Sequence, residues 1–217
     1  GGSPFAVSLA QALERADVGT LIADTNRQHL SHARQAGIPT YHGDILGEVA
    51  EHKVEFVAYS TVLVASDNDA YNTLVATDMG PDLGREHVWQ LSRVREGSRH
   101  ALPAQLGGQR LEGRPTFETV NQRIAEGWAI RSTRLTEEYD AEAWRADRPN
   151  AVPILTISKG ELCFVGEDMA FSAQPQDWIT AFVPPEQSGY SVEQNGRAAA
   201  QASEVVEEHR GARQSGN

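Results

Sequence analysis

Residues 1–24 read GGSPFAVSLAQALERADVGTLIAD, and this stretch decides the fold class. Residues 4–16 predict a helix, because their apolar residues recur at helical spacing, and Pro4 stands where a first-turn proline is tolerated. The run VGTLIA over 18–23 is short, apolar and β-rich, and it stops at Asp24. A helix that leads into such a run is typical of a parallel α/β sheet, whose strands are buried on both faces.

The same theme repeats along the first half of the chain. Three further apolar runs, bounded by turn residues, predict strands over 38–42, 61–65 and 86–91. Between them, 26–36 and 69–79 have helical spacing, with Gly37 and Gly80 as expected end caps. The alternation predicts an α/β fold with a Rossmann-like, doubly wound parallel sheet over residues 1–92.

One element of that fold is missing from the sequence. A doubly wound sheet begins with a strand, yet the first helix follows directly after Gly1, Gly2 and Ser3. We expect the first strand to lie upstream of Gly1. The alternative is a fold without this strand, which would leave the centre of the sheet open.

The second half has a different pattern. Residues 93–114 are rich in Gly and Arg and are expected to form a connector. Residues 115–185 predict a small α+β domain with a helix over 115–126, a short helix over 136–144 capped by Thr136, and strands over 128–135, 152–158, 161–165 and 178–183. Cys163 is expected in the core of the third of these strands. Residues 186–217 are predicted to be mostly disordered.

The composition excludes several classes of protein. Nineteen basic against thirty acidic residues give a net charge of −11, which argues against binding to a nucleic-acid backbone. One cysteine allows neither an internal disulfide nor a thiolate zinc site. No apolar run approaches the length of a membrane helix, and there is no signal peptide.

The loop before the first helix is a candidate anion site. In the frame G-x-G-x-x-G, Gly1 fits, Ser3 replaces the second glycine and Ala6 replaces the third. The amino end of a helix offers free N–H groups and a positive dipole to a phosphate. We therefore assign phosphate binding to Gly1, Gly2, Ser3, Pro4 and Phe5.

Polar residues that follow the next strands complete the candidate site. Asp24, with Thr25 and Asn26, stands where a carboxylate accepts the ribose hydroxyls of an adenosine, although it is also a good helix cap. A carboxylate here favours NAD(H) or a plain adenine nucleotide over NADP(H), and Arg27 weakens that preference slightly. Further along the chain, Gly43 ends the next strand, and Asp44 and Ile45 are expected to flank the adenine unless they only form a turn. Ser66 is expected to meet the pyrophosphate or the ribose, with Asn68 at the same edge of the sheet, unless these residues only cap a helix.

Enzyme signatures are absent from the sequence. None of the five tyrosines has a lysine four residues on, and neither a phosphate-loop motif G-x-x-x-x-G-K-[ST] nor a G-x-S-x-G is present. His29 and His32 are expected on a solvated helix face. A nucleotide site without a catalytic group predicts a sensor rather than an enzyme.

The motifs of the first half resemble a known family. The elements LA-x-x-L from Leu9, D-T-N from Asp24, G-D-I-L from Gly43 and N-D-x-x-N from Asn68 are similar to those of the TrkA-N (RCK) nucleotide-binding domain. More narrowly, they resemble the version at the cytoplasmic C-terminus of bacterial sodium:proton antiporters of the cation:proton antiporter-1 class. Residues 115–185, with ILTISKGELCF and QPQDWITAFVPPE, resemble a TrkA-C-like companion domain.

The resemblance implies a regulatory, non-catalytic role. It implies a homodimer that binds NAD(H) or AMP, ADP or ATP and gates a monovalent cation transporter, with the transmembrane domain upstream of Gly1. The protein would then lie in the cytoplasm, on the inner face of the membrane. Two alternatives stay open, namely an NAD-dependent oxidoreductase and a degenerate dimerisation scaffold that binds no nucleotide.

Overall fold

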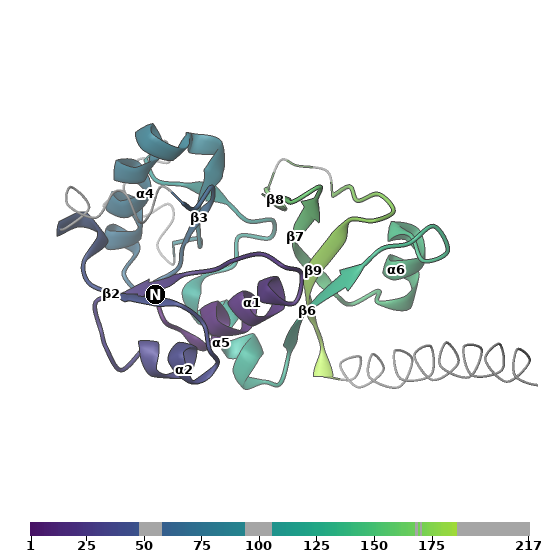
Figure 1. Cartoon of the computed structure of the whole chain (residues 1–217), viewed down its shortest axis with the longest axis horizontal. Helices are drawn as coiled ribbons and strands as arrows, with labels where there is room; N and C mark the ends of the chain where they lie inside the picture. Colours follow the sequence, from purple (N-terminus) through teal and green to yellow (C-terminus); the bar gives the residue numbers. More distant parts are fainter. Residues whose placement is uncertain (48–57, 94–105, 168, 170, 186–217) are drawn as a thin grey trace, which may run out of the picture.

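The structure is a computed structural model that describes residues 1–47, 58–93, 106–167, 169 and 171–185 (Figure 1). The tail that we predict to be disordered, 186–217, lies outside the described residues, as does most of the expected connector. The described part contains the two element patterns that the sequence predicts, one after the other along the chain.

The first half alternates helices with short strands. Its elements, in chain order, are α1 (Pro4–Glu14), β1 (Ile22–Asp24), α2 (Leu30–Gln35), β2 (Thr40–His42), β3 (Val62–Val64), α4 (Asp69–Leu83), the 3₁₀ helix η1 (Arg85–His87), β4 (Val88–Gln90) and β5 (Gln109–Arg110). Strand β1 pairs with β2, and β3, β4 and β5 pair in that order, all in parallel. The parallel α/β class is therefore confirmed.

Two differences from the expected elements concern the helices. Helix α4 does not end at Gly80 but continues through Pro81 to Leu83, because Met79 is buried and Leu83 packs in the same small core. Helix α2 begins at Leu30 rather than at residue 26. The side chain of Asn26 instead accepts a hydrogen bond from the N–H of Gln28, at 2.9 Å, and holds a turn ahead of the helix.

The second half forms one antiparallel sheet of four strands in the order β6-β9-β7-β8. Its elements are α5 (Phe117–Ala125), β6 (Ala129–Arg134), α6 (Ala141–Asp147), β7 (Val152–Ser158), β8 (Glu161–Phe164) and β9 (Trp178–Val183). Helix α6 is capped by Asp140, whose carboxylate accepts from the N–H of Ala143 at 2.9 Å, and not by Thr136. Cys163 is exposed, contrary to expectation, because β8 is an edge strand and buries Phe164 instead.

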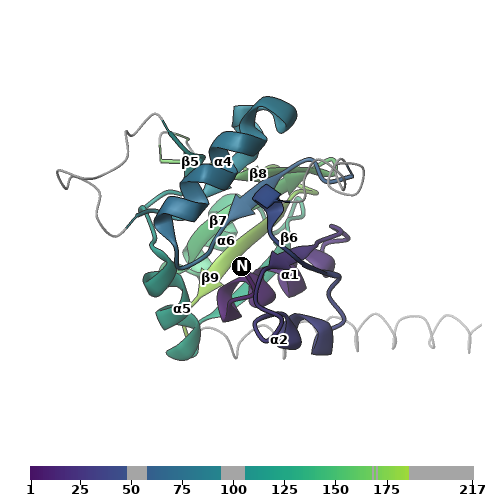
Figure 2. The ribbon, with the colours of Figure 1, turned by 90° about the vertical axis from the view of Figure 1, so that its left-hand side faces the viewer.

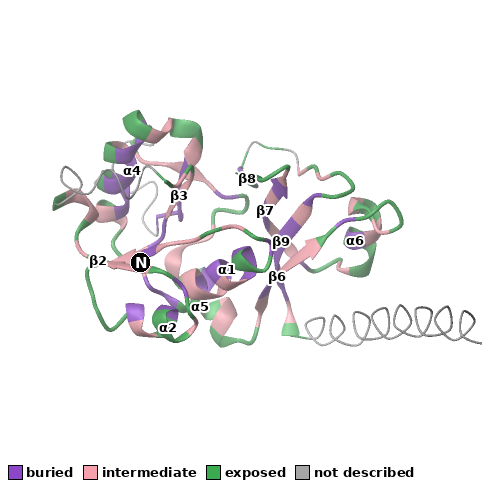
Figure 3. Ribbon diagram, in the orientation of Figure 1, coloured by how far each residue is buried: buried purple, intermediate pink, exposed green. Residues whose placement is uncertain are grey.

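Helix α1 belongs to both halves of the molecule. Phe5, fully buried, stacks on Phe182 of β9 with ring centroids 5.8 Å apart. The Ser132 hydroxyl of β6 donates to the carbonyl oxygen of Ala12 at 2.7 Å. The buried face of α1 visible in Figure 3 thus packs on the antiparallel sheet, and one hydrophobic core joins residues that are more than 100 positions apart in the chain.

The parallel strands form two separate sheets rather than one. In the described residues, β1 has only β2 beside it, and β3 has only β4. Helices α1 and α2 lie together, away from α4 (Figure 2). This arrangement resembles a doubly wound fold in which the place between β1 and β3 is open.

Candidate functional site

A cavity of about 650 Å³ opens at the carboxyl ends of β1 and β3. Ligands of open parallel α/β sheets bind at this edge. Nine of the predicted site residues line the cavity, and they come from five separate segments of the chain: Gly1, Phe5, Asp24, Thr25, Asn26, Gly43, Ile45, Ser66 and Asn68. Gly2, Ser3, Pro4 and Asp44 are not among its lining residues, although Gly2, Pro4 and Asp44 are each next in sequence to one that is.

The two glycines sit where the carboxyl ends of the strands approach each other. A Cβ atom on Gly1 would lie 2.7 Å from the carbonyl oxygen of Ala65, just after β3. A Cβ on Gly2 would lie 2.6 Å from the carbonyl oxygen of His29. Both positions therefore exclude any larger residue on steric grounds, which explains the glycine pair without reference to a ligand.

Asp24 holds the loop in place with both carboxylate oxygens. One oxygen accepts from the N–H of Gly2 at 2.7 Å and lies 3.2 Å from Nδ1 of His29, and the other accepts from the N–H of Asn26 at 2.7 Å. Burial raises the pKa of Asp24, but these hydrogen bonds outweigh it and the pKa lies below its usual value. The residue is thus an anion in the cavity wall, and the oxygen that accepts from Asn26 keeps a lone pair for a ribose hydroxyl.

The amino end of α1 has its donors occupied by the protein. Pro4 has no N–H, the Phe5 N–H donates to Oδ1 of Asn121 on α5 at 3.0 Å, and the Ala6 N–H donates to the hydroxyl of Ser3 at 3.3 Å. Ser3, in the place of the second glycine of the motif, is therefore the N-cap of α1. The prediction that this helix offers free N–H groups to a phosphate is wrong for this conformation, because capping and a contact from the second half satisfy them.

Ser66 and Asn68 are likewise held by neighbours. The buried amide of Asn72 accepts from the Ser66 hydroxyl at 2.6 Å and from its N–H at 3.1 Å, and it donates to the Ser66 carbonyl at 2.8 Å. The side chain of Asn68 caps α4 by accepting from the N–H of Tyr71 at 3.0 Å. The cap of α4 is therefore Asn68, and Asp69 is the first residue of the helix.

Asp44 and Tyr71 form a pair at the rim of the cavity. The Tyr71 hydroxyl donates to the Asp44 carboxylate at 2.7 Å. The pKa of Tyr71 is raised to about 12, mainly by partial burial and secondly by this hydrogen bond. The same bond lowers the pKa of Asp44. Asp44 is exposed and therefore remains a charged acceptor beside the cavity.

Three residues of this site were not assigned to it from the sequence. Tyr71 and Asn72 lie on the first turn of α4, and the motif N-D-x-x-N signalled Asn72 without showing that it fastens Ser66. His29 was expected to face solvent only, yet its ring contacts Asp24. The sequence did not signal this contact. His29 precedes α2, which begins at Leu30, so no helical spacing relates its ring to Asp24.

The described residues offer neither a cluster of metal ligands nor a helix that could span a membrane. No group of three or more His, Cys, Asp and Glu side chains there is arranged to hold a metal ion. No helix in the described ranges is long and apolar enough to span a membrane.

These features define a Rossmann-like α/β domain with its polar residues gathered at the carboxyl edge of the strands. Residues 1–96 match the family model of the TrkA-N domain, which is consistent with an RCK/TrkA-N regulatory domain in this part of the chain. The TrkA-N domain is an NAD-binding regulatory domain of potassium-transport-type systems, and it typically binds a ligand rather than catalysing a reaction. Comparison with curated proteins gave no match.

Proposed function

We propose that this protein is the nucleotide-binding regulatory part of a monovalent cation transporter, a cation:proton antiporter or a potassium transport system. The adenosine of NAD(H) or of AMP, ADP or ATP would occupy the cavity, with its ribose on Asp24 and its adenine between Gly43 and Ile45. The observation that carries this proposal is the convergence of these residues with Gly1, Ser66 and Asn68 on one cavity.

The electrostatics of the cavity support this choice of ligand. The Asp24 carboxylate has a lowered pKa and retains an acceptor position for a ribose hydroxyl, on the oxygen that accepts from Asn26. The same charge repels a phosphate on the ribose 2′-oxygen, so NAD(H) is favoured over NADP(H). Arg27 lies at the same turn, where its carbonyl oxygen accepts from Arg34 at 2.8 Å. Its positive charge reduces the preference for NAD(H) over NADP(H).

The regulatory step that we propose uses the shared core. Because α1 contacts the cavity on one side and Phe182 on the other, a ligand that moves α1 also moves the antiparallel sheet. In a homodimer on the cytoplasmic face of a membrane, this movement would bias a transmembrane transport domain upstream of Gly1. The bias equals the difference in the nucleotide's affinity for the two states of the dimer.

A second candidate function is a dimerisation scaffold without a nucleotide. It is favoured by the α1 amino end, where Pro4 lacks an N–H and the N–H groups of Phe5 and Ala6 are already bonded. A phosphate would have to displace Asn121 or Ser3 from these donors, which reduces the free energy gained on binding.

Titration calorimetry and thermal shift with NAD, NADH, NADPH, AMP, ADP and ATP separate the two functions. At a ligand concentration of 100 times Kd, the stabilisation is about 2.7 kcal/mol, or roughly 5–10 °C in Tm for a chain of this size. Asp24→Ala should abolish the shift. Asp140→Ala is the matched control, because it removes a remote carboxylate that, like Asp24, accepts a hydrogen bond from a backbone N–H. No shift with any nucleotide would refute the sensor and leave the scaffold.

A further inference from the structure

His29 is a titratable side chain in the wall of the cavity. It lies beside Asp24, and the side chain of His29 is 56% exposed whereas that of Asp24 is 11% exposed. The Nδ1 atom of His29 is 3.2 Å from the Asp24 carboxylate oxygen that also accepts from the N–H of Gly2. A ring that takes up protons from solvent therefore touches the carboxylate that we assign to the ribose.

The hydrogen bonds of the turn between β1 and α2 decide which nitrogen of His29 carries the proton. The Oδ1 atom of Asn26 accepts from the N–H of Gln28 at 2.9 Å, so the amide nitrogen of Asn26 faces Nε2 of His29, at 3.2 Å. An amide nitrogen only donates, and Nε2 is therefore the acceptor in the neutral ring. The proton of the neutral ring is then on Nδ1, which donates it to the Asp24 carboxylate.

Protonation of His29 changes the charge of the ribose site. When Nε2 is protonated as well, the ring is a cation beside the carboxylate, and the pair of His29 and Asp24 has no net charge. When the ring is neutral, the pair has the single negative charge of Asp24. Histidine is the side chain that ordinarily changes charge between pH 5 and 8. The pKa of Asp24 lies below its usual value, so the carboxylate stays ionised over this whole range.

The charge of this pair bears on one part of a nucleotide, the 2′ position of its adenosine ribose. A hydroxyl there is uncharged, whereas a phosphate there has about two negative charges at neutral pH. An Asp24 carboxylate beside a neutral ring repels the phosphate. A cationic His29 offsets that repulsion and offers the phosphate a charged hydrogen-bond donor. Affinity for a 2′-phosphate should thus depend on the charge of His29 far more than affinity for a 2′-hydroxyl.

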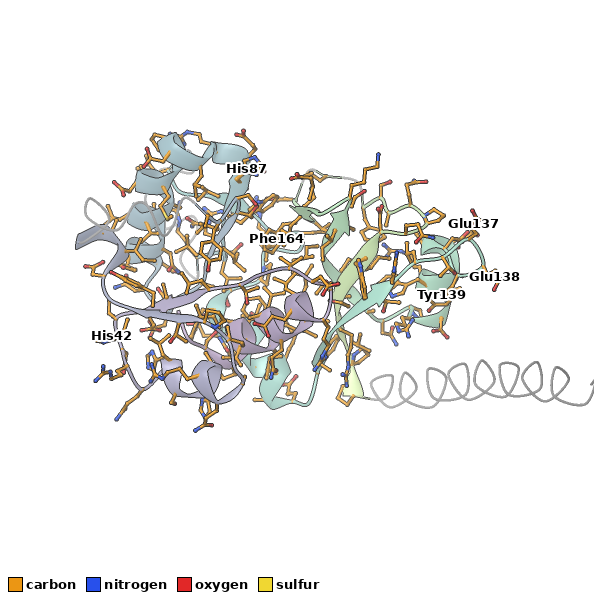
Figure 4. The ribbon with its side chains drawn as sticks, in the orientation of Figure 1. His42, His87, Glu137, Glu138, Tyr139 and Phe164 are labelled. Atoms are coloured by element: carbon orange, nitrogen blue, oxygen red, sulfur yellow. The ribbon has the colours of Figure 1, made fainter. Side chains whose placement is uncertain are left out.

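Other titratable or charged groups lie around this pair, namely the Gly1 amino group, Arg27, His42 and Tyr71. His42, labelled in Figure 4, is opposite Asp24 in the pairing of β1 with β2, and its Nε2 lies 3.1 Å from the carbonyl oxygen of Thr25. A carbonyl oxygen only accepts, so Nε2 of His42 is protonated in both charge states and this contact survives titration. Burial lowers the pKa of the Gly1 amino group, which therefore also titrates near neutral pH. Arg27 stays charged, and Tyr71, with its pKa raised to about 12, stays neutral.

We propose that His29 sets, through its own protonation, how strongly the site discriminates between a ribose with a free 2′-hydroxyl and a ribose with a 2′-phosphate. Neutral His29 leaves the Asp24 carboxylate to reject NADP, and protonated His29 admits it. Binding of NAD changes little between the two states. This inference rests on the proposed nucleotide site and adds a pH-dependent specificity to it.

The test measures Kd for NAD and for NADP by titration calorimetry at about pH 5.5, 7 and 8.5, on both sides of the range in which histidine titrates. The parent is compared with His29→Gln, which is never charged, and His29→Arg, which is always charged. His42→Gln is the matched control, because it removes a neighbouring titratable ring that contacts a carbonyl oxygen instead of the carboxylate. The 2′-phosphate itself takes up a proton near pH 6, and the Gly1 amino group also titrates, but both are common to all variants.

The expected result is a pH dependence that only His29 supplies. Between about pH 8.5 and 5.5, the ratio of Kd for NADP to Kd for NAD should fall about tenfold more in the parent than in His29→Gln, as expected for one unit charge acting over several ångströms at a partly exposed site. His29→Arg should keep the ratio low at every pH, and His42→Gln should follow the parent.

The outcomes separate this role of His29 from the nucleotide site itself. Rejection of NADP at every pH, an equal pH dependence in the parent and His29→Gln, or its loss in His42→Gln alone would overturn the role of His29 while NAD still binds. Absence of binding by both nucleotides at every pH would refute the nucleotide site, and this inference with it.

Discussion

The stacking of Phe5 on Phe182 predicts that the two halves of the protein unfold together. Phe5 lies on α1 and Phe182 on β9, both at most 3% exposed. Truncating a buried phenylalanine to alanine costs about 3–5 kcal/mol, which would leave little stability to measure, so we choose leucine at both positions. Each single change is expected to cost about 1–2 kcal/mol, or roughly 2–8 °C in Tm for a chain of this length.

The coupling between the two sites is the quantity that tests the shared core. Edge and stacked aromatic pairs contribute about 0.5–1.5 kcal/mol beyond the area that they bury. The double variant Phe5→Leu/Phe182→Leu should therefore cost less than the sum of the single variants by this amount. Urea unfolding is followed by far-UV circular dichroism and by tryptophan fluorescence, because tryptophans lie in both halves, Trp89 in the first and Trp128, Trp144 and Trp178 in the second.

A control pair of substitutions shows how closely the changes in unfolding free energy add when two residues do not touch. Val75→Ala removes a side chain from a separate core cluster beneath α4 and shares no contact cluster with Phe182. Combined with Phe182→Leu, it should be additive within about 0.5 kcal/mol. If Phe5→Leu and Phe182→Leu are equally additive, or if the two probes give separate transitions with Phe5→Leu moving only one, the reasoning from the shared core is refuted.

Three more predictions rest on single contacts. Asn121→Leu leaves the Phe5 N–H without its acceptor, so stability falls by about 1–3 kcal/mol in urea unfolding, and calorimetry shows tighter nucleotide binding if phosphate uses that donor. Ser132→Ala loses the bond to the carbonyl of Ala12 and the one with the buried Thr180 hydroxyl, and costs about 1 kcal/mol or more; an unchanged midpoint would mean that neither contact contributes. The folded pKa of Asp24 lies below the unfolded value of about 3.9, so its contribution to stability is present above that pH and is lost as pH falls through the folded pKa. Unfolding free energy should accordingly drop more steeply below pH 4 in the parent than in Asp24→Ala, and parallel curves would exclude the hydrogen-bonded carboxylate as the cause.

Local pattern was enough to predict most elements. Apolar runs such as 18–23 and the helical spacing of 4–16 reflect short-range preferences. The observed α1 lies inside its predicted range, and β1 begins inside its run and ends one residue beyond it, at Asp24. Errors arose where a distant contact decided a boundary. Gly80 and Pro81 signal a helix end, but Leu83 packs in the core beneath α4 and the helix continues. Cys163 lies in an apolar run, yet the edge position of β8 exposes it.

The sequence by itself determined that the chain alternates helices with buried parallel strands, and that Asp24 and Ser66 stand where strands end. Because carboxyl ends of parallel strands meet at one edge, this was sufficient to bring those residues to one cavity. Only the tertiary structure decided which hydrogen-bond groups are still available there. Asn121 reaches the Phe5 N–H across 116 positions of sequence, and no periodicity encodes such a contact, since it depends on how two sheets pack around α1.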